Sequence, residues 1–577
     1  MKPLKRHLRI VAALCALALL LALIPGRAAA YVPQTNILKI GLYYGGSALQ
    51  SANLQNVAGA GSGFEFGYFD ATTREFVSVG AVTYETKITM LRDANMYGYV
   101  DSSDEGRYAY RQSPTSDTVV GCFHIQVPGV YPDFYTAAVT AESYIEGFVK
   151  YDSGAFVVCT GDYVTRADAE AAIASRGIPG SVTSGTSYTV SVVATGTGRV
   201  VFEFDAGATH ALGVRPLATG GEKPQSWFKG YKYYGAFQYF RVDGQNLRVI
   251  NFVDVEDYTK GLLPYEMSNT WPIEALKAQA VCARTYALSK LGAHGSSGFD
   301  LCATDHCQVY RGTGSANANT DRAVEETLGQ YVTYNGALCE TYYASCDGGA
   351  TEDVENVWAQ PLPYLRGVID PYEVDIASRV SKYNWTVTYT PAELTSRLQG
   401  RGYSCGTITS LTVSQYTNNG NVYSVLIKDA NGRSWTVKKD DVRIVLGTNS
   451  IRFTIGGGTQ PGTTTSTDTR VYVNTDAGTN ELNSGALYSI AADGTTQLPS
   501  DGALYAITGS GVIEEVGTPS APTQSSGDGK INGVFVINGT GKGHNVGMSQ
   551  WGAYAMANRG LTYRDIIHFY YTGVEIG

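Results

Sequence analysis

A glutamate in an apolar setting is the first residue of this sequence suited to acid–base chemistry. Glu266 follows Leu262 and Leu263 closely, and Met267 comes directly after it. We expect Glu266 in a turn just ahead of a helix that begins near Pro272, because proline is tolerated in a first helical turn, where its missing N–H would be unpaired anyway. Burial would raise the pKa of the carboxyl group, whereas a helix N-terminus would lower it. These two effects oppose each other; a carboxyl group whose pKa is raised could act as a general acid, and Glu266 is the leading candidate.

The helix after Glu266 carries further polar residues. Leu276, Ala280, Ala283 and Ala287 recur at helical spacing, and this nearly all-alanine face allows another element to pack closely. Three polar residues lie along the same helix and cannot all share one narrow face: Gln279, Arg284 and Tyr286. We expect some of them to contact a substrate and others to hold the structure.

Other acidic residues near Glu266 receive structural interpretations. Glu256 and Asp257 are interpreted as turn and capping residues. Glu274, in the first turn of the helix, is interpreted as a side chain that favours the helix dipole.

Two cysteines and two histidines form a candidate metal site. They are His294, Cys302, His306 and Cys307. Two thiolates and two imidazoles satisfy tetrahedral zinc, and four protein ligands make such a site structural. Asp305 is a candidate partner for a ligating histidine. Adjacent ligands at 306 and 307 are geometrically awkward, so a Cys302–Cys307 disulfide and two free thiols remain alternatives.

The composition limits the class of protein. The chain has 577 residues and a net charge of −9, so we expect several domains and no nucleic-acid partner, since a basic footprint is missing. The 41 tyrosines and 67 glycines suit many short strands and turns. We expect a multidomain α+β fold with a β-rich core and a few helices.

The N-terminus resembles an export signal. Basic residues precede an apolar run at 10–24, and Ala28-Ala29-Ala30 offers a cleavage site. The run is shorter than the roughly 20 residues that span a bilayer. We favour a cleaved signal over residues 1–30, with an uncleaved membrane anchor as the alternative; either places the bulk of the chain outside the cytoplasm. Eight cysteines follow Cys15, and Cys122 and Cys159 are candidates to face each other across neighbouring strands.

Composition and periodicity predict the domain order. A β-rich region at 31–117 precedes an α/β module at 118–185, in which Thr165 is placed to cap a helix and Gly177 to end it. A core begins at 186 and continues to 456. Linkers and a small inserted β module, with related segments at 485–490 and 502–507, occupy 457–530. The core resumes at 531–577, so the ends of the insertion should lie close together.

Four ordered segments carry a resemblance to a known family. They are the segment around Pro264-Tyr-Glu266-Met267 with its following helix, Asp300 to Tyr310, Trp358 to Arg366, and Gly541-Lys-Gly-His-Asn-Val-Gly-Met-Ser-Gln-Trp-Gly-Ala553. Together they resemble the stage II sporulation protein D / amidase-enhancer family of bacterial cell-wall proteins. Asn545 stands where the family usually has glycine, and asparagine tolerates the left-handed geometry.

The resemblance implies a peptidoglycan lytic transglycosylase. Glu266 would protonate the glycosidic oxygen between N-acetylmuramic acid and N-acetylglucosamine, and 1,6-anhydro ends would result. His544, Ser549 and Gln550 would hydrogen-bond N-acetyl or hydroxyl groups; a Ser/His nucleophile pair has no evident acid partner. The family includes zinc-binding members. The substrate would be glycan strands, in spore engulfment or wall remodelling.

Two further implications follow. The same motifs occur in non-catalytic wall-binding proteins that enhance an N-acetylmuramoyl-L-alanine amidase, so this is the alternative function, and an amidase is a candidate partner. The segment Asp162 to Ala172 resembles a sporulation-related repeat domain, which implies that 118–185 binds peptide-free glycan; an unrelated small α+β module is the alternative.

Overall fold

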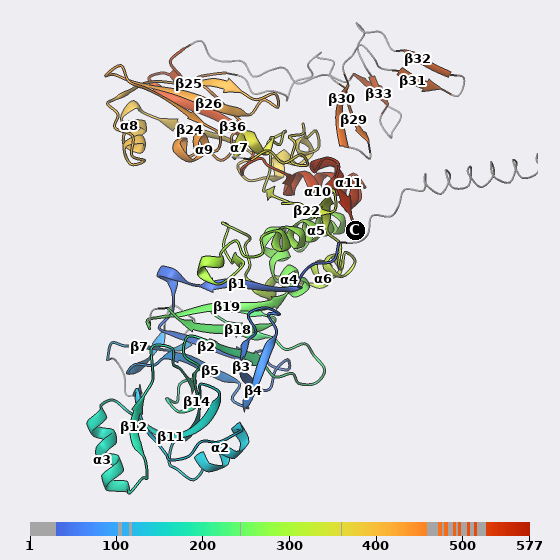
Figure 1. The fold of residues 1–577 in the computed structure, drawn as a ribbon. Helices are drawn as coiled ribbons and strands as arrows, with labels where there is room; N and C mark the ends of the chain where they lie inside the picture. Colours follow the sequence, from blue (N-terminus) through green and yellow to red (C-terminus); the bar gives the residue numbers. More distant parts are fainter. Residues whose placement is uncertain are drawn as a thin grey trace, which may run out of the picture.

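The structure is a computed structural model. It describes residues 31–101, 107–114, 118–242, 244–358, 360–458 and 527–577, and the backbone of six strands between 471 and 515. The predicted signal at 1–30 lies outside these residues. Figure 1 shows a β-rich body at each end of the molecule with a group of helices between them, which confirms the predicted multidomain α+β fold. No helix in the described part of the chain is long and apolar enough to cross a membrane.

Two sheets build the N-terminal body. The first contains seven strands, in the order β20 (Leu301–Cys302), β1 (Ile37–Tyr43), β19 (Leu247–Asp254), β18 (Ala236–Arg241), β15 (Leu212–Pro216), β3 (Phe64–Phe69) and β4 (Phe76–Thr83). The second contains ten, in the order β12 (Ser181–Ser184), β9 (Phe123–Gln126), β11 (Ala155–Tyr163), β10 (Gly147–Asp152), β14 (Val200–Asp205), β13 (Val190–Ala194), β5 (Lys87–Arg92), β2 (Ser51–Asn56), β16 (Ser226–Phe228) and β17 (Tyr231–Tyr233). A third sheet has three short strands: β6 (Met96–Asp101), β7 (Arg107–Arg111) and β8 (Val119–Val120).

These sheets cross the expected domain boundaries. The alternating apolar side chains of β1 bury Leu38 and Ile40 completely, and β1 pairs antiparallel with β19, more than 200 residues later in the chain. β5, from the expected first region, pairs with β13 of the core. The boundaries drawn at 117 and 185 therefore do not separate independent sheets, because backbone pairing between distant strands is not visible in local sequence.

The segment 123–184 forms a β-α-β-β-α-β unit. α2 (Phe134–Ala141) and α3 (Arg166–Arg176) connect four antiparallel strands in the order β12, β9, β11, β10. Thr165 caps α3 by accepting from the Asp168 N–H, and Gly177 ends it in the left-handed conformation, as predicted. Cys159 lies opposite Gln126, and Cys122 and Cys159 are both free, so the predicted pairing of these cysteines is wrong.

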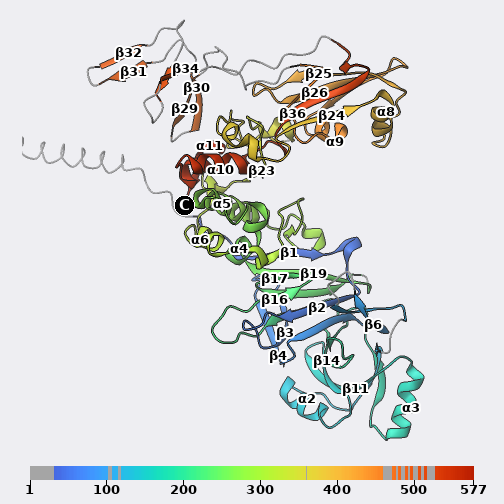
Figure 2. The same cartoon turned by 180° about the vertical axis from the view of Figure 1, so that it is seen from behind.

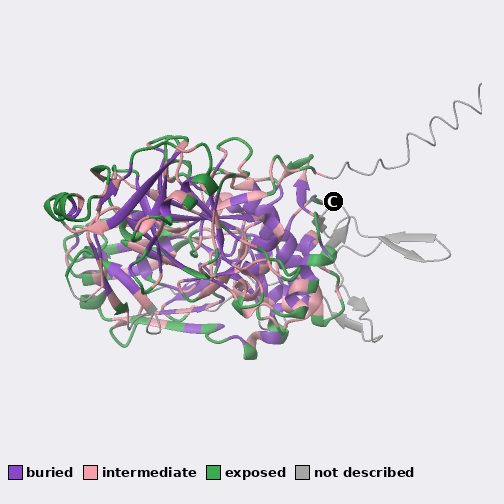
Figure 3. Ribbon diagram, turned by 90° about the horizontal axis from the view of Figure 1, so that it is seen from below, coloured by how far each residue is buried: buried purple, intermediate pink, exposed green. Residues whose placement is uncertain are grey.

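Helices occupy the middle of the molecule. α5 (Ile273–Ser289) is buried along almost its whole length, and its small residues allow neighbouring helices to approach. The neighbours are α4 (Val255–Glu266), α6 (Ala318–Glu325), α10 (Gln550–Asn558) and α11 (Tyr563–Tyr570). The view from behind in Figure 2 shows α10 and α11 stacked on α5. Figure 3 shows that buried residues run through both the strands and these helices.

Short elements surround the helices. They are β21 (Val332–Tyr334), β22 (Ala337–Leu338), β23 (Tyr343–Ala344), β37 (Met548–Ser549), β38 (Glu575–Ile576), α7 (Val354–Val357) and the 3-10 helices η1 (Gly45–Ser47), η2 (Gly295–Ser297), η3 (Gly312–Ser315) and η4 (Glu373–Arg379). β23 pairs in parallel with β37, which joins two segments 200 residues apart.

The second β body contains the C-terminal return of the chain. Its strands are β24 (Asn384–Tyr389), β25 (Ile408–Tyr416), β26 (Val422–Asp429), β27 (Ser434–Lys438), β28 (Phe453–Ile455), β35 (Lys530–Ile531) and β36 (Val534–Thr540), with α8 (Pro391–Gln399) and α9 (Asp441–Leu446). β36 lies between β24 and β28.

The chain leaves this body and returns to it at one place. The Gly456 N–H donates to the Val536 carbonyl, and Gly529 lies directly beside Gly456. Between these points, three hairpins are described: β29 (Val471–Thr475) with β30 (Gly478–Leu482), β31 (Tyr488–Ala491) with β32 (Gly494–Gln497), and β33 (Tyr505–Ile507) with β34 (Ile513–Glu515).

Candidate active site and metal centre

Glu266 ends a helix instead of preceding one. It is the last residue of α4, which accommodates Pro264 in its last turn, and Met267 caps the helix by donating to the Leu263 carbonyl. The turn predicted around Glu266 is therefore wrong, because the apolar residues Leu262 and Leu263 pack as part of a buried helix. The Glu266 side chain lines a cavity of about 340 Å³.

The Glu266 carboxyl group has a raised pKa. Burial is the largest cause, and it outweighs three hydrogen bonds that favour the charged form. Oε1 accepts from the Val309 N–H at 2.9 Å, and Oε2 accepts from Gln550 Nε2 at 3.3 Å. The carboxyl group is thus fixed in orientation and biased towards its protonated form, which suits a general acid.

Two residues that the sequence interpretation missed complete the environment of Glu266. The Tyr343 side chain hydrogen-bonds to the carboxyl group. Gln308 Nε2 donates to the Tyr343 hydroxyl at 3.0 Å, and Gln308 Oε1 accepts from the buried Tyr258 hydroxyl at 3.0 Å. Gln308 directly follows Cys307 in the segment Asp300 to Tyr310. Its position in this motif is the only feature of the sequence that could have identified it as a site residue.

The walls of the cavity are aromatic. Tyr286 lines the cavity, with its ring 5.5 Å from that of Tyr342, and the ring of His544 lies 4.9 Å from the Trp358 ring. Burial lowers the pKa of His544 to about 4, so the imidazole is neutral near pH 7. Its Nδ1 accepts from the Val546 N–H at 3.0 Å. Flat aromatic surfaces and a few polar groups are the usual lining of a small-molecule site.

Gln550 and Gln279 form a row behind the carboxyl group. Gln550 lines the cavity and bridges Glu266 and Gln279, whose Oε1 lies 3.4 Å from Gln550 Nε2. Gln279 is fully buried on α5 and is not among the residues that line the cavity. Gln550 therefore lines the cavity, and Gln279 contacts Gln550 from outside it; substrate contact by Gln550 stays a prediction.

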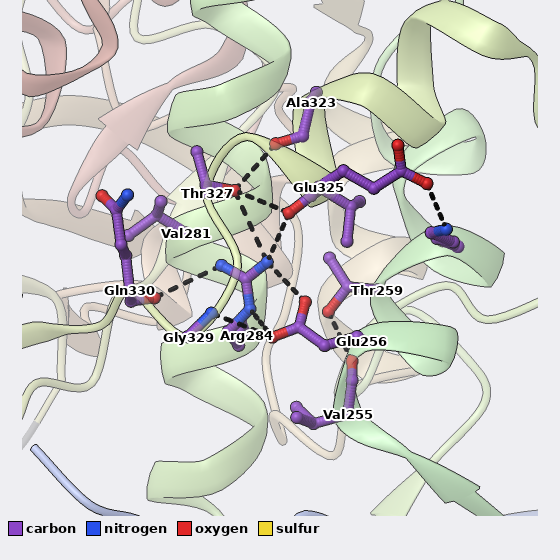
Figure 4. Close-up of polar contacts among 12 residues, drawn as sticks. Val255, Glu256, Thr259, Val281, Arg284, Ala323, Glu325, Thr327, Gly329 and Gln330 are labelled. Carbon is purple, nitrogen blue, oxygen red and sulfur yellow. Dashed lines mark hydrogen bonds and ion pairs between the residues drawn. The ribbon is translucent and has the colours of Figure 1, made fainter.

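Arg284 lies outside the cavity. Figure 4 shows its guanidinium facing Glu256, with Nε and Nη2 donating to the two carboxylate oxygens at 2.8 and 2.7 Å. Nη1 also donates to the Gln330 carbonyl at 3.3 Å. The side chain is fully buried, so the prediction of substrate contact is wrong for this residue. Glu256, interpreted as a capping residue, is its partner in a bidentate ion pair.

Ser549 is also outside the cavity. It caps α10 by accepting from the Gly552 N–H at 3.0 Å, and its hydroxyl donates to Glu373. Substrate contact by Ser549 is therefore a wrong prediction. Helix capping explains the serine at this position.

Glu373 belongs to a buried carboxyl cluster, made of Asp347, Asp370 and Glu373. Their oxygens lie within 4.8 Å of one another. Burial raises the pKa of all three groups, and neighbouring acids add to the rise for Asp347 and for Glu373, whose pKa reaches about 7. Oδ2 of Asp347 is buried and has no hydrogen-bond partner among the described residues. The cluster holds Ser549, and with it the start of α10, in place.

The four predicted metal ligands lie together. Donor atoms of His294, Cys302, His306 and Cys307 are within 4.8 Å of one another. His294 Nε2 is 3.2 Å from Cys307 Sγ, and His306 Nδ1 is 3.5 Å from it, so the adjacent residues 306 and 307 both face the same point. Both cysteines are free. Two sulfur and two nitrogen donors converging on one point fit tetrahedral zinc.

The turn before α10 keeps the expected geometry. Asn545 adopts φ 62°, and its Nδ2 donates to the carbonyls of Asp347 and Ala350 at 2.6 and 3.1 Å. Asparagine thus replaces the family's glycine without loss of the left-handed turn.

Known proteins match the same part of the chain. A family model described as SpoIID, stage II sporulation protein, matches residues 243–334, which include Glu266 and the Cys/His group. Stage II sporulation protein D of Bacillus subtilis is 26% identical over 341 residues, covering 56% of this chain and 74% of that protein. This part of the chain is thus similar to the stage II sporulation protein D family.

Two other known proteins are similar to this chain over a comparable length. An amidase enhancer of Bacillus subtilis is 29% identical over 317 residues, which cover 55% of this chain and 40% of that protein. An uncharacterized protein of Brachyspira hyodysenteriae is 29% identical over 351 residues, covering 60% of this chain and 73% of the relative.

Proposed function

We propose that this protein is a lytic transglycosylase that cleaves peptidoglycan glycan strands with Glu266 as both acid and base. The observation that carries the proposal is the setting of Glu266: one buried carboxyl group with a raised pKa, held by Val309 and Gln550 in a cavity with aromatic walls. The similarity to stage II sporulation protein D supports a role at the cell wall during sporulation.

The reaction needs only one carboxyl group. Protonated Glu266 gives its proton to the glycosidic oxygen as the bond to C1 of the muramic acid breaks, and the sugar becomes oxocarbenium-like. The 6-hydroxyl of the same sugar then attacks C1, and the Glu266 carboxylate takes the hydroxyl proton. The products are a free 4-hydroxyl and a 1,6-anhydro ring, no water is consumed, and Glu266 is protonated again. A raised pKa serves the first step.

The Cys/His group is proposed to hold structural zinc. Four protein donors leave no open position for a bound water, so the metal would supply a cross-link and no reactive hydroxide. Cys307 precedes Val309 by two residues, and the Val309 N–H holds Glu266. A zinc ion that holds this loop in place would therefore also hold Glu266 in place.

The test is digestion of peptide-free glycan strands by the mature chain and by Glu266→Gln, followed by mass spectrometry. We expect anhydro ends from the wild type and at least about a 100-fold loss in the variant, because a general acid contributes that much or more. Hydrated reducing ends would instead indicate a hydrolase. Anhydro ends from both proteins would show that another residue is the acid.

The second candidate function is enhancement of a wall amidase without catalysis. The 29% identity to an amidase enhancer supports it. In this case the protein would bind glycan strands, but neither the wild type nor Glu266→Gln would yield anhydro ends. A wall amidase would release more peptide when the chain is added. Both functions require glycan strands outside the cytoplasm, with an amidase as a candidate partner, and the 118–185 module is proposed to bind glycan freed of peptides.

A further inference from the structure

A second cavity adjoins the candidate active site. It has a volume of about 540 Å³, and it shares Trp358 with the cavity that contains Glu266. Val357 of α7 also lines it, and the rest of its lining comes from the second β body, mainly from β27 and α9. The side chains used below are Tyr403, Thr436, Lys438, Lys439 and Asp441.

Trp358, which forms the wall between the two cavities, is held in place by a residue of the second cavity. Lys439 adopts a left-handed φ of 59°, a conformation that costs free energy for any residue other than glycine. Its Nζ donates to the Trp358 carbonyl at 2.7 Å, and the next N–H, of Asp440, donates to the Val357 carbonyl at 3.4 Å. The two cavities are therefore joined by a fixed wall.

Buried contacts keep the second β body in register with the helices. Asn421 Nδ2 donates to the Thr351 carbonyl at 3.2 Å and to Glu352 Oε2 at 2.9 Å, and the Thr417 hydroxyl donates to the same carboxylate oxygen at 2.6 Å. Because Asn421 and Glu352 are almost completely buried, these bonds are protected from water. A ligand that occupies both cavities thus meets a preformed surface.

The lining of the second cavity suits a sugar polymer. Trp358 and Tyr403 supply aromatic surface for the apolar side of a sugar ring, while Thr436 and Asp441 supply hydroxyl and carboxylate groups for its hydroxyls. Lys438 is exposed and carries positive charge. Muramic acid without its peptide bears a lactyl carboxylate, which a lysine attracts. A muramic acid that keeps its peptide has this carboxylate blocked as an amide.

We propose that this cavity is a further glycan subsite, which binds sugars beyond the bond cleaved at Glu266 and favours peptide-free strands through Lys438. The inference rests on the proposed glycan-binding function and deepens it. A polymer that is cleaved within its length must extend past the reacting bond. The second β body would bind this extension.

Binding by a catalytically silenced chain tests the proposal. The full-length Glu266→Gln variant is titrated with peptide-free strands separated by length, and again after adding Lys438→Glu or Tyr403→Ala. The matched control is Lys428→Glu, an exposed lysine of the same sheet outside the cavity. We expect Lys438→Glu to weaken binding of long strands about fivefold or more, roughly 1 kcal/mol, with little effect on disaccharides.

Each outcome is decisive. An unchanged preference for long strands in both Lys438→Glu and Tyr403→Ala would overturn the subsite, while intact disaccharide binding would leave the proposed function standing. Equal losses for Lys438→Glu and Lys428→Glu would show a general charge effect and overturn the assignment of Lys438. If the Glu266→Gln variant binds no glycan strand, whatever its length, both the proposed function and the subsite are refuted.

Discussion

At the scale of single residues, the environment gives Glu266 its chemistry. Other carboxyl groups near it in sequence have different partners: Glu256 pairs with Arg284, and Asp257 pairs with Lys223. Only Glu266 of these three faces the cavity. A neutral His544 and the aromatic side chains beside it leave the carboxyl group without a nearby cation, so burial decides its pKa.

Arg284→Ala should destabilise the fold and leave glycan binding unchanged. Removing one partner of a buried ion pair leaves the other charge unpaired and lowers the free energy of unfolding by about 3–5 kcal/mol. Urea unfolding measures the loss of stability, and strand binding by the folded variant, in the Glu266→Gln background, measures the role in recognition. Weaker binding with unchanged stability would restore Arg284 as a substrate contact.

At the scale of elements, one loop connects the metal centre to the acid. Residues 302–309 carry three of the four metal donors, the Gln308 side chain that orients Tyr343, and the Val309 N–H that holds Glu266. A loop without regular hydrogen bonding needs a cross-link to keep such a position. Zinc bound by the Cys/His group is proposed to provide it.

The purified protein should therefore contain one zinc ion. Elemental analysis should find the ion in wild type and lose it in Cys302→Ser and His294→Ala, while the matched control Cys122→Ser, outside the group, keeps it. Chelation should lower Tm, because binding free energy of the metal stabilises the folded loop. A metal-free protein of equal Tm, or a Cys302–Cys307 disulfide seen by mass spectrometry, would refute the zinc site.

At the scale of the whole molecule, the carboxyl cluster joins distant parts of the chain. Glu373 accepts from the N–H groups of Asp347 and Gly348 and from Ser549 at the start of α10, and the Gly348 carbonyl accepts from Thr540 of β36. The cluster thus ties the helices to the second β body. Its three acids lie so close together that ionising all of them is unfavourable.

Stability should consequently fall as pH rises from about 4 through the pKa of Glu373, near 7. Raised acid pKa values mean that the folded state binds more protons than the unfolded state over this range. Asp347→Asn keeps the acceptor for the Gly349 N–H and removes one charge. Thermal unfolding from pH 4 to 8 should show a shallower decline in this variant and higher stability than wild type at pH 8. Parallel profiles would contradict the role of the cluster.

Local sequence was sufficient for the chemical groups and for several helix ends. The cap at Thr165, the helix end at Gly177 and the left-handed Asn545 follow from side-chain chemistry within a few residues, and the four Cys/His residues converge as predicted. The family motifs also identified the cavity residues Glu266, Tyr286, His544 and Gln550.

Tertiary structure decided which distant segments of the chain contact one another. Arg284 and Ser549 lie in the same motifs as cavity residues, yet packing buries them against Glu256 and Glu373. Strand pairing placed β1 beside β19 and β36 between β24 and β28, and so fixed the boundaries of the sheets. The residues carry the chemistry in their types and spacing, but which carboxyl group is buried, paired or open to a cavity depends on contacts made across hundreds of residues.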